Sequence, residues 1–447
     1  MNLTPLFKLS LISGALMLAA CGGDDNSSSS NNTDDEHNHA ASARILMTSN
    51  SDTALTVFDQ AHEEFEALGQ ATEMSGNVIR SDDGLSAAVV TSDGVQFVYS
   101  GIHAEEHEEG EEHEEGEEHE EDEEHSETHD AEILTALTLN EAGLTVSMTQ
   151  NHFAVLKGGN TQFYPAAELE EATEPKAGLE LTGVTQTYPA AILDKEHALR
   201  LVFAKDKAIV YEGTEATETV LDCVSPTAVV KAHEMTLAQC GTALIAVVVE
   251  EHEHAEEAQA AEEGASEDEP SIETPTIDLG TLEVSKLVSN GHKAVVFGSS
   301  GLALKSVTWK DDQVMIVDME LEPAKDEVSG EPKATAICDV DFATADTKAG
   351  ILTNDGQLHF TDLKANTTRK IELDDSNENA TCADWALTSG PQSFTVMDSD
   401  VGKMYYIDSH DGHPYHIHEK FDLTSGTDVA AAAMLHAVGM EHNHDDH

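Results

Sequence analysis

Short runs of alternating apolar and polar residues recur along most of this chain, and the runs come in pairs around a tight turn. The turns carry Asp-Gly, Gly-Gly or Asn-Asp-Gly, as hairpins require. Alternation with a period of two predicts strands, and no stretch shows a sustained helical period. Eight hairpin pairs follow from this pattern: Arg44–Asp59, Leu85–Tyr99, His152–Tyr164, His197–Tyr211, Met235–Val249, His292–Leu304, Lys348–Phe360 and Ser393–Ile407.

The spacing of the pairs predicts the fold class. Successive pairs start mostly about 40–45 residues apart, and the spacing rises where acidic inserts intervene. Four strands in a unit of that length are typical of a β-propeller blade. We therefore expect an all-β chain, a propeller of seven or eight blades over residues 44–435, with one blade closed by strands from both chain ends. A tandem of β-sandwiches is the alternative.

Two acidic, histidine-containing inserts occupy the same place in this repeat. If each pair is the second and third strand of a blade, residues 101–130 and 250–270 both follow a third strand. His152, His197 and His292 each open a second strand. Turns between first and second strands and between third and fourth strands emerge on one face of a propeller. We therefore expect both inserts and these histidines to share a face.

The first insert has the composition of a metal-binding segment. Between His103 and Asp130 it holds six histidines and seventeen carboxylates, with Glu-Glu-His-Glu-Glu-Gly as its repeating unit. Neutral imidazole is the commonest zinc ligand, and carboxylates can complete the shell. Copper and nickel ions bind the same types of ligand, so the composition does not exclude them. We expect a disordered, multi-site zinc collector, with the solvating acidic run as the alternative; its candidate ligands are His103, His107, His113, His119, His125 and His129.

Shorter segments also combine histidines with nearby acidic residues. His37 and His39 precede the first strand pair, and His252 and His254 lie in the second insert. Residues 436–447 form a His/Asp-rich tail. His416 and His418 alternate along a predicted outer strand, beside His410 and His413, so they would point to one side and could form half a metal site. A role in strand pairing is the alternative.

The N-terminus predicts an exported lipoprotein. Residues 1–20 combine Lys8 with a short apolar stretch, and Leu18-Ala19-Ala20-Cys21 resembles a lipobox, in which the cysteine is lipidated. Residues 21–43 then form a flexible acidic tether. Because Gly22 rather than an aspartate follows Cys21, we expect an anchor on the periplasmic face of the outer membrane. An ordinary signal peptide is the alternative.

The remaining four cysteines agree with export, because an even number in an oxidising compartment suggests disulfides. Three pairings are possible, and the local one, Cys223 with Cys240 and Cys338 with Cys382, is favoured. A zinc–thiolate site is the alternative, although no C-x-x-C spacing is present.

Charge and motifs narrow the function classes. The formal net charge is −65, from 22 basic and 87 acidic residues. Such a negative field attracts cations and disfavours binding to nucleic acid and to anionic membrane surfaces. Membrane contact is therefore expected through the lipid anchor alone. The sequence contains no nucleophile elbow, zincin helix, P-loop or dinucleotide fingerprint. We expect a binding protein and not an enzyme.

Several segments resemble the AztD-type periplasmic zinc metallochaperones. They are residues 34–59 (DDEHNHAASARILMTSNSDTALTVFD), residues 100–109 (SGIHAEEHEE), Cys223 and Cys240 around one hairpin, and residues 352–363 (LTNDGQLHFTDL). The resemblance implies a propeller that passes zinc to the solute-binding protein of an ABC importer.

The ligands that this resemblance carries over by position are His37, His39, His103, His107 and His152. The chain departs from the family pattern at Thr187–Pro189, where the family has His-His-Gly, and at Pro226–Val229, where it has Leu-His-Gly-Glu. His233 is the nearby replacement candidate. A passive, metal-buffering or scaffolding propeller without directed transfer is the alternative function.

Overall fold

The structure is a computed structural model that describes part of the chain. The described set comprises residues 43–102, 129–170, 172, 174–175, 177–250, 271–299, 301–319, 321–322, 325, 329–331, 333–334, 336–343, 348–362, 367–373, 381–409, 415–423 and 428–436. The signal peptide and the lipobox predicted from the sequence lie outside this set, and so does the predicted tether except for its last residue, Ala43, which is buried in the propeller.

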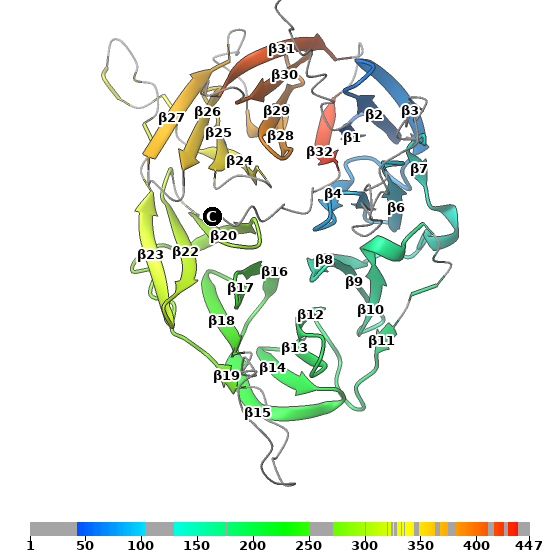
Figure 1. Cartoon of the computed structure of the whole chain (residues 1–447), viewed down its shortest axis with the longest axis vertical. Coiled ribbons are helices and arrows are strands. Elements are labelled where there is room, and N and C mark those ends of the chain that lie inside the picture. The colour runs from blue at the N-terminus through cyan, green and yellow to red at the C-terminus, as the bar shows by residue number, and fades with distance from the viewer. Residues whose placement is uncertain are drawn as a thin grey trace, which may run out of the picture. The chain divides into compact units, whose positions relative to one another are not determined.

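The described residues form an eight-bladed β-propeller, each blade being a four-stranded antiparallel sheet (Figure 1). The prediction of an all-β propeller with seven or eight blades is thereby confirmed. Strands are named a to d from the propeller centre outward. Helix is limited, in the described ranges, to three single turns: η1 (Thr135–Leu137), η2 (Ala166–Glu168) and η3 (Cys382–Asp384).

The first four blades take strands from both chain ends and from the first half of the sequence. Blade 1 is β32 (Val429–Leu435), β1 (Arg44–Ser49), β2 (Ala54–Asp59) and β3 (Glu64–Gln70), and blade 2 is β4 (Asn77–Arg80), β5 (Ser86–Val90), β6 (Val95–Tyr99) and β7 (Glu132–Ile133). Blade 3 is β8 (Thr145–Thr149), β9 (His152–Lys157), β10 (Asn160–Pro165) and β11 (Ala177–Leu179), and blade 4 is β12 (Tyr188–Asp194), β13 (Leu199–Ala204), β14 (Lys207–Glu212) and β15 (Glu215–Asp222).

The other four blades follow in chain order. Blade 5 is β16 (Pro226–Ala232), β17 (Met235–Cys240), β18 (Ala243–Glu250) and β19 (Ser271–Glu273), and blade 6 is β20 (Val284–Ser289), β21 (Ala294–Gly298), β22 (Leu304–Lys310) and β23 (Gln313–Met319). Blade 7 is β24 (Ile337–Phe342), β25 (Lys348–Thr353), β26 (Gln357–Asp362) and β27 (Thr367–Glu372), and blade 8 is β28 (Trp385–Ser389), β29 (Ser393–Asp398), β30 (Lys403–Asp408) and β31 (His416–Asp422).

Burial changes from the inner to the outer strands of a blade. The b strand β29 is buried at all six positions, because neighbouring blades cover both of its faces. The d strand β15 alternates between exposed and half-buried residues, as expected where only one face is covered. The core between blades 2 and 3 shows the packing: the rings of Phe97 and Phe153 lie 5.3 Å apart, and those of Phe97 and Tyr164 lie 5.0 Å apart.

The antiparallel order gives the propeller two different faces. Connections a–b and c–d emerge on one face, named the a–b face here, and connections b–c and d–a emerge on the other. Residues 103–128 connect β6 to β7, and residues 251–270 connect β18 to β19. Both are c–d connections, as the repeat predicts. The chain also enters β1 and leaves β32 at the a–b face.

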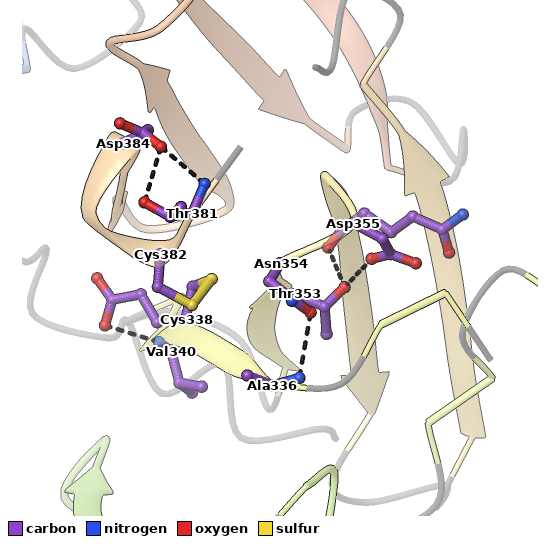
Figure 2. Close-up of a disulfide and its surroundings, with 11 residues drawn as sticks. Ala336, Cys338, Val340, Thr353, Asn354, Asp355, Thr381, Cys382 and Asp384 are labelled. Carbon is purple, nitrogen blue, oxygen red and sulfur yellow. Dashed lines mark hydrogen bonds between the residues drawn. A yellow bond between two sulfur atoms is a disulfide. The ribbon is translucent and has the colours of Figure 1, made fainter. Parts of the chain in front are cut away.

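Both predicted disulfides are present, Cys223–Cys240 and Cys338–Cys382. Each joins two neighbouring blades on the face opposite the a–b face. Cys338 lies near the start of β24, and Cys382 begins η3 just before β28 (Figure 2). There Asp384 Oδ2 accepts hydrogen bonds from the main-chain N–H of Thr381 at 2.7 Å and from its hydroxyl at 2.9 Å. The disulfides therefore tie blades 4 to 5 and 7 to 8 away from the histidines.

Candidate metal centre

Histidines of the propeller gather on one face. Ten of the histidines lie within the described residues, and nine of these stand at a–b or c–d connections or at strand ends beside them. The exception is His359, inside β26. The nine are His62, His129, His152, His197, His233, His292, His416, His418 and His436. The expectation that His152, His197 and His292 lie near a–b turns is confirmed.

Carboxylates accompany several of the exposed histidines. Nδ1 of His62 lies 3.2 Å from Asp59 Oδ2, Nδ1 of His197 lies 3.3 Å from Asp194 Oδ1, and Nδ1 of His233 lies 3.8 Å from Glu234 Oε1. An imidazole beside a carboxylate offers a metal two ligands, or one ligand and a group that orients it. These pairs stand on different blades, so each alone is an incomplete site.

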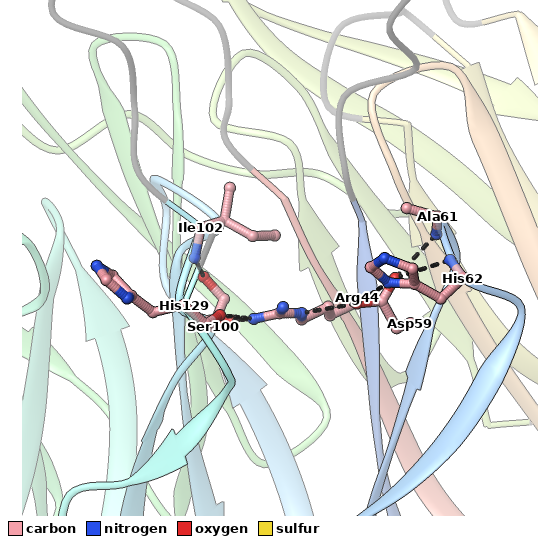
Figure 3. A network of polar contacts seen from close by, with 7 residues as sticks. All are labelled: Arg44, Asp59, Ala61, His62, Ser100, Ile102 and His129. Atoms are coloured by element: carbon pink, nitrogen blue, oxygen red, sulfur yellow. Dashed lines mark hydrogen bonds and ion pairs between the residues drawn. The ribbon is translucent and has the colours of Figure 1, made fainter. Parts of the chain in front are cut away.

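A buried arginine is hydrogen-bonded to the main chain at both ends of the first insert (Figure 3). The guanidinium of Arg44 donates to the carbonyl oxygens of Ser100 and His129, and its Nε lies 3.3 Å from Asp59 Oδ2. The N–H of His129 donates to the Gly101 carbonyl at 2.9 Å. Burial raises the pKa of the Asp59 carboxyl, but hydrogen bonds from His62 and the charge of Arg44 outweigh it, so the net pKa is lowered. Both ends of the insert are thus fixed to the propeller.

The densest ligand group lies on the outer strands of blade 8. Asp408 ends β30, and it pairs across the sheet with His416, the first residue of β31. The nitrogen and oxygen atoms that Asp408, His416 and His418 can offer a metal all lie within 4.8 Å of one another. Nδ1 of His418 is 3.8 Å from Asp408 Oδ1. Within the described ranges, this is the one group of three or more His, Cys, Asp or Glu residues so arranged.

Two histidines are buried and differ from the rest. His359 and His436 have no exposed surface. Burial lowers the pKa of His359 to about 4. Burial, followed by the charge of Arg80, lowers the pKa of His436 to about 3. The sequence groups His436 with the His/Asp-rich segment 436–447, but its ring is enclosed at the end of β32 and is not presented to solvent.

Nine of the predicted ligands cannot be placed. They lie outside the described residues: His37, His39, His103, His107, His113, His119, His125, His252 and His254. His129 and His233 are exposed and His152 is half-buried, and none of the three belongs to the blade 8 group. His416 and His418 come together as their alternation predicts, while His410 and His413 lie outside the described ranges. Asp408 was missed because it is adjacent only through strand pairing.

Fold and site together define a class: an eight-bladed propeller with a histidine-bearing face. Among solved structures, apo AztD from Citrobacter koseri is similar, with a TM-score of 0.60 and 12% identity over 90% of this chain and 99% of that one. A second crystal structure of Citrobacter koseri AztD gives a TM-score of 0.61 and 12% identity, with 90% and 100% covered. At this identity the likeness establishes the fold.

More distant comparisons add little. Hsv2 from Kluyveromyces lactis matches with a TM-score of 0.41 and 8% identity over 78% of this chain and 100% of that one, too weak a similarity to bear on the site. No protein-family model and no curated protein matches the sequence. In the described residues, none of the helices has the length and apolar character needed to cross a membrane.

Proposed function

We propose that this protein is a zinc-binding propeller of the periplasm that captures Zn²⁺ on its a–b face and passes it to the solute-binding protein of a zinc importer. The observation that carries the proposal is the gathering of nine of the ten described histidines on that face, eight of them exposed or half-buried and only His436 enclosed. Both histidine-bearing inserts join strands there. The sequence resemblance to the AztD-type metallochaperones supports the same function.

Capture follows from charge and ligand chemistry. The formal net charge of −65 raises the local concentration of cations near the protein. Neutral imidazoles beside carboxylates then supply the N/O ligands that zinc prefers. Ligands on separate connections can be exchanged one at a time, which favours release to a competing site over permanent retention. The proposed role is therefore binding and delivery without catalysis.

Zinc transfer tests this proposal. The zinc-loaded full-length chain is mixed with a metal-free periplasmic zinc solute-binding protein, and the ion is followed by the receptor's fluorescence or by rapid separation and metal analysis. We expect transfer to be faster than zinc release from the same chain into buffer containing a chelator, because ligand exchange in a complex avoids free zinc. Transfer no faster than that release would show a passive buffer.

Anchoring at Cys21 is a separate part of the proposal, supported by the lipobox-like Leu18–Cys21 sequence. The lipid would hold the chain on the periplasmic face of the outer membrane. Cys21→Ser is expected to abolish incorporation of labelled fatty acid and to move the protein from the outer-membrane fraction to the soluble periplasmic fraction. Retention of the variant in the membrane fraction would contradict the anchor while leaving zinc binding untouched.

A further inference from the structure

A β-bulge shapes the ligand group of blade 8. Asp408 pairs with His416 and Ile407 with Ile417, but the register then shifts so that Tyr406 pairs with Glu419. His418 is therefore the extra residue on β31. Bulges redirect a side chain at a sheet edge and are found beside functional sites. The His418 ring stands edge-on to Tyr406 and to His416, with centroids 6.3 Å and 6.1 Å apart.

The ligand set suits zinc that must remain exchangeable. Two imidazoles and one carboxylate are a three-ligand set, which in zinc proteins leaves the fourth tetrahedral position to water or to an incoming ligand. Zn–N and Zn–O bonds of about 2.0–2.2 Å place the ligand atoms of a tetrahedron about 3.4 Å apart. Since the atoms here lie within 4.8 Å of one another, side-chain rotations that bring them closer by up to about 1.4 Å close the shell.

The ligand side chains differ in their exposure, as expected for a metal site that is open to solvent on one side. The side chain of Asp408 is 19% exposed and that of His418 is 45% exposed. The carboxylate is thus held near the sheet while the imidazole stays accessible. Ligands carried on paired strands keep their geometry better than ligands on loops. Elsewhere on the a–b face, His62, His197 and His233 each meet a carboxylate but no second imidazole within the described residues.

We propose that Asp408, His416 and His418 form an ordered site for one zinc ion, with one coordination position open for exchange. The inference rests on the proposed function for the ion's identity and for its onward transfer. The coordination itself depends only on these three side chains.

Substitution in the full-length chain tests the site. Asp408→Asn, His416→Gln and His418→Gln are compared with His197→Gln, which removes an exposed histidine paired with a carboxylate on the same face. Zinc is titrated in competition with a chromophoric chelator. We expect the zinc affinity of the blade 8 site to fall in each of the three variants. The fall should be at least the ~10- to 100-fold typical of losing a residue that only hydrogen-bonds to a metal ligand. The His197 variant should retain the affinity, and circular dichroism checks that each variant is folded.

A site-resolved measurement separates this binding from zinc bound elsewhere. Ring signals of His416 and His418 are assigned in the full-length chain from the spectra of the two substitutions and followed by NMR during the zinc titration. Both should shift together, and Asp408→Asn should abolish the joint shift. Signals that stay in place at saturating zinc, or that shift equally in Asp408→Asn, would overturn the site.

The two proposals can fail separately. Joint shifts of the two rings without transfer to a receptor would leave the site standing and refute the delivery function. Transfer with no change at either ring would refute the site and place the exchanged ion elsewhere.

Discussion

Replacing residues 103–128 with a short Gly-Ser linker is expected to remove about two zinc ions from each chain and to leave the propeller folded. The segment holds five histidines among sixteen carboxylates. With about two imidazoles and additional carboxylates for each ion, five histidines account for about two ions. The propeller should stay folded because Arg44, on β1, donates to the carbonyls of Ser100, shortly before the segment, and His129, directly after it (Figure 3).

Equilibrium dialysis followed by metal analysis measures this loss, and thermal unfolding in EDTA checks the core. The matched control keeps the length and the carboxylates of the segment but changes its five histidines to glutamine. It should lose most of the same zinc, because imidazoles and not acidic charge select the ion. Unchanged stoichiometry in the linker variant would refute the collector, and a loss confined to the linker variant would assign binding to the carboxylates.

Acidification is expected to destabilise the propeller through its two buried histidines. The pKa of His359 lies at about 4 and that of His436 at about 3, below the ordinary value of 6.5. Between these values the unfolded chain binds protons that the folded chain excludes. The two neutral histidines therefore contribute their full share of the folding stability above pH ~6.5. That contribution is lost as the pH falls toward their pKa values in the folded chain. At ~1.4 kcal/mol for each unit, the loss amounts to a few kcal/mol for each histidine.

Urea unfolding in EDTA between pH 7.5 and 5 measures the effect, and His359→Leu isolates it. The variant loses some packing at every pH, but its stability should fall less on acidification than that of the parent chain. Subtracting one curve from the other removes the background from the many carboxylates. His197→Gln, a change at an exposed histidine, should follow the parent. Equal slopes for the parent and His359→Leu would contradict the assignment.

The b–c hairpins were predictable because their strands alternate around turn residues that allow few other structures. Pairs such as Lys348–Phe360 correspond to β25 and β26. The a strands were less visible: β12 is buried at all seven positions and therefore shows no alternation. The d strands are often short, as in β7 and β19. Blade number consequently depended on counting hairpins, which left seven or eight as the choice.

The metal centre was predictable only in part. Alternation placed His416 and His418 on one side of a strand, because that follows from local geometry. Asp408 joins them through cross-strand pairing and a register shift, which no spacing in the sequence encodes. Composition also could not distinguish His359 and His436, enclosed in the core, from the exposed histidines. Burial depends on what packs around a residue, and that is known only once the blades are assembled.

Blade 1 has a consequence for how the molecule is made. Its innermost strand, β32, is the last strand within the described residues, and it pairs Leu435 with Arg44 of β1, the first of them. The ring can close only after residues 429–435 have emerged, and this most distant pairing carries the largest loop-closure cost. A chain that stops before residue 429 would present β1 as an open edge, ready to pair with another molecule. Premature termination should therefore lead to aggregation and not to a seven-bladed ring.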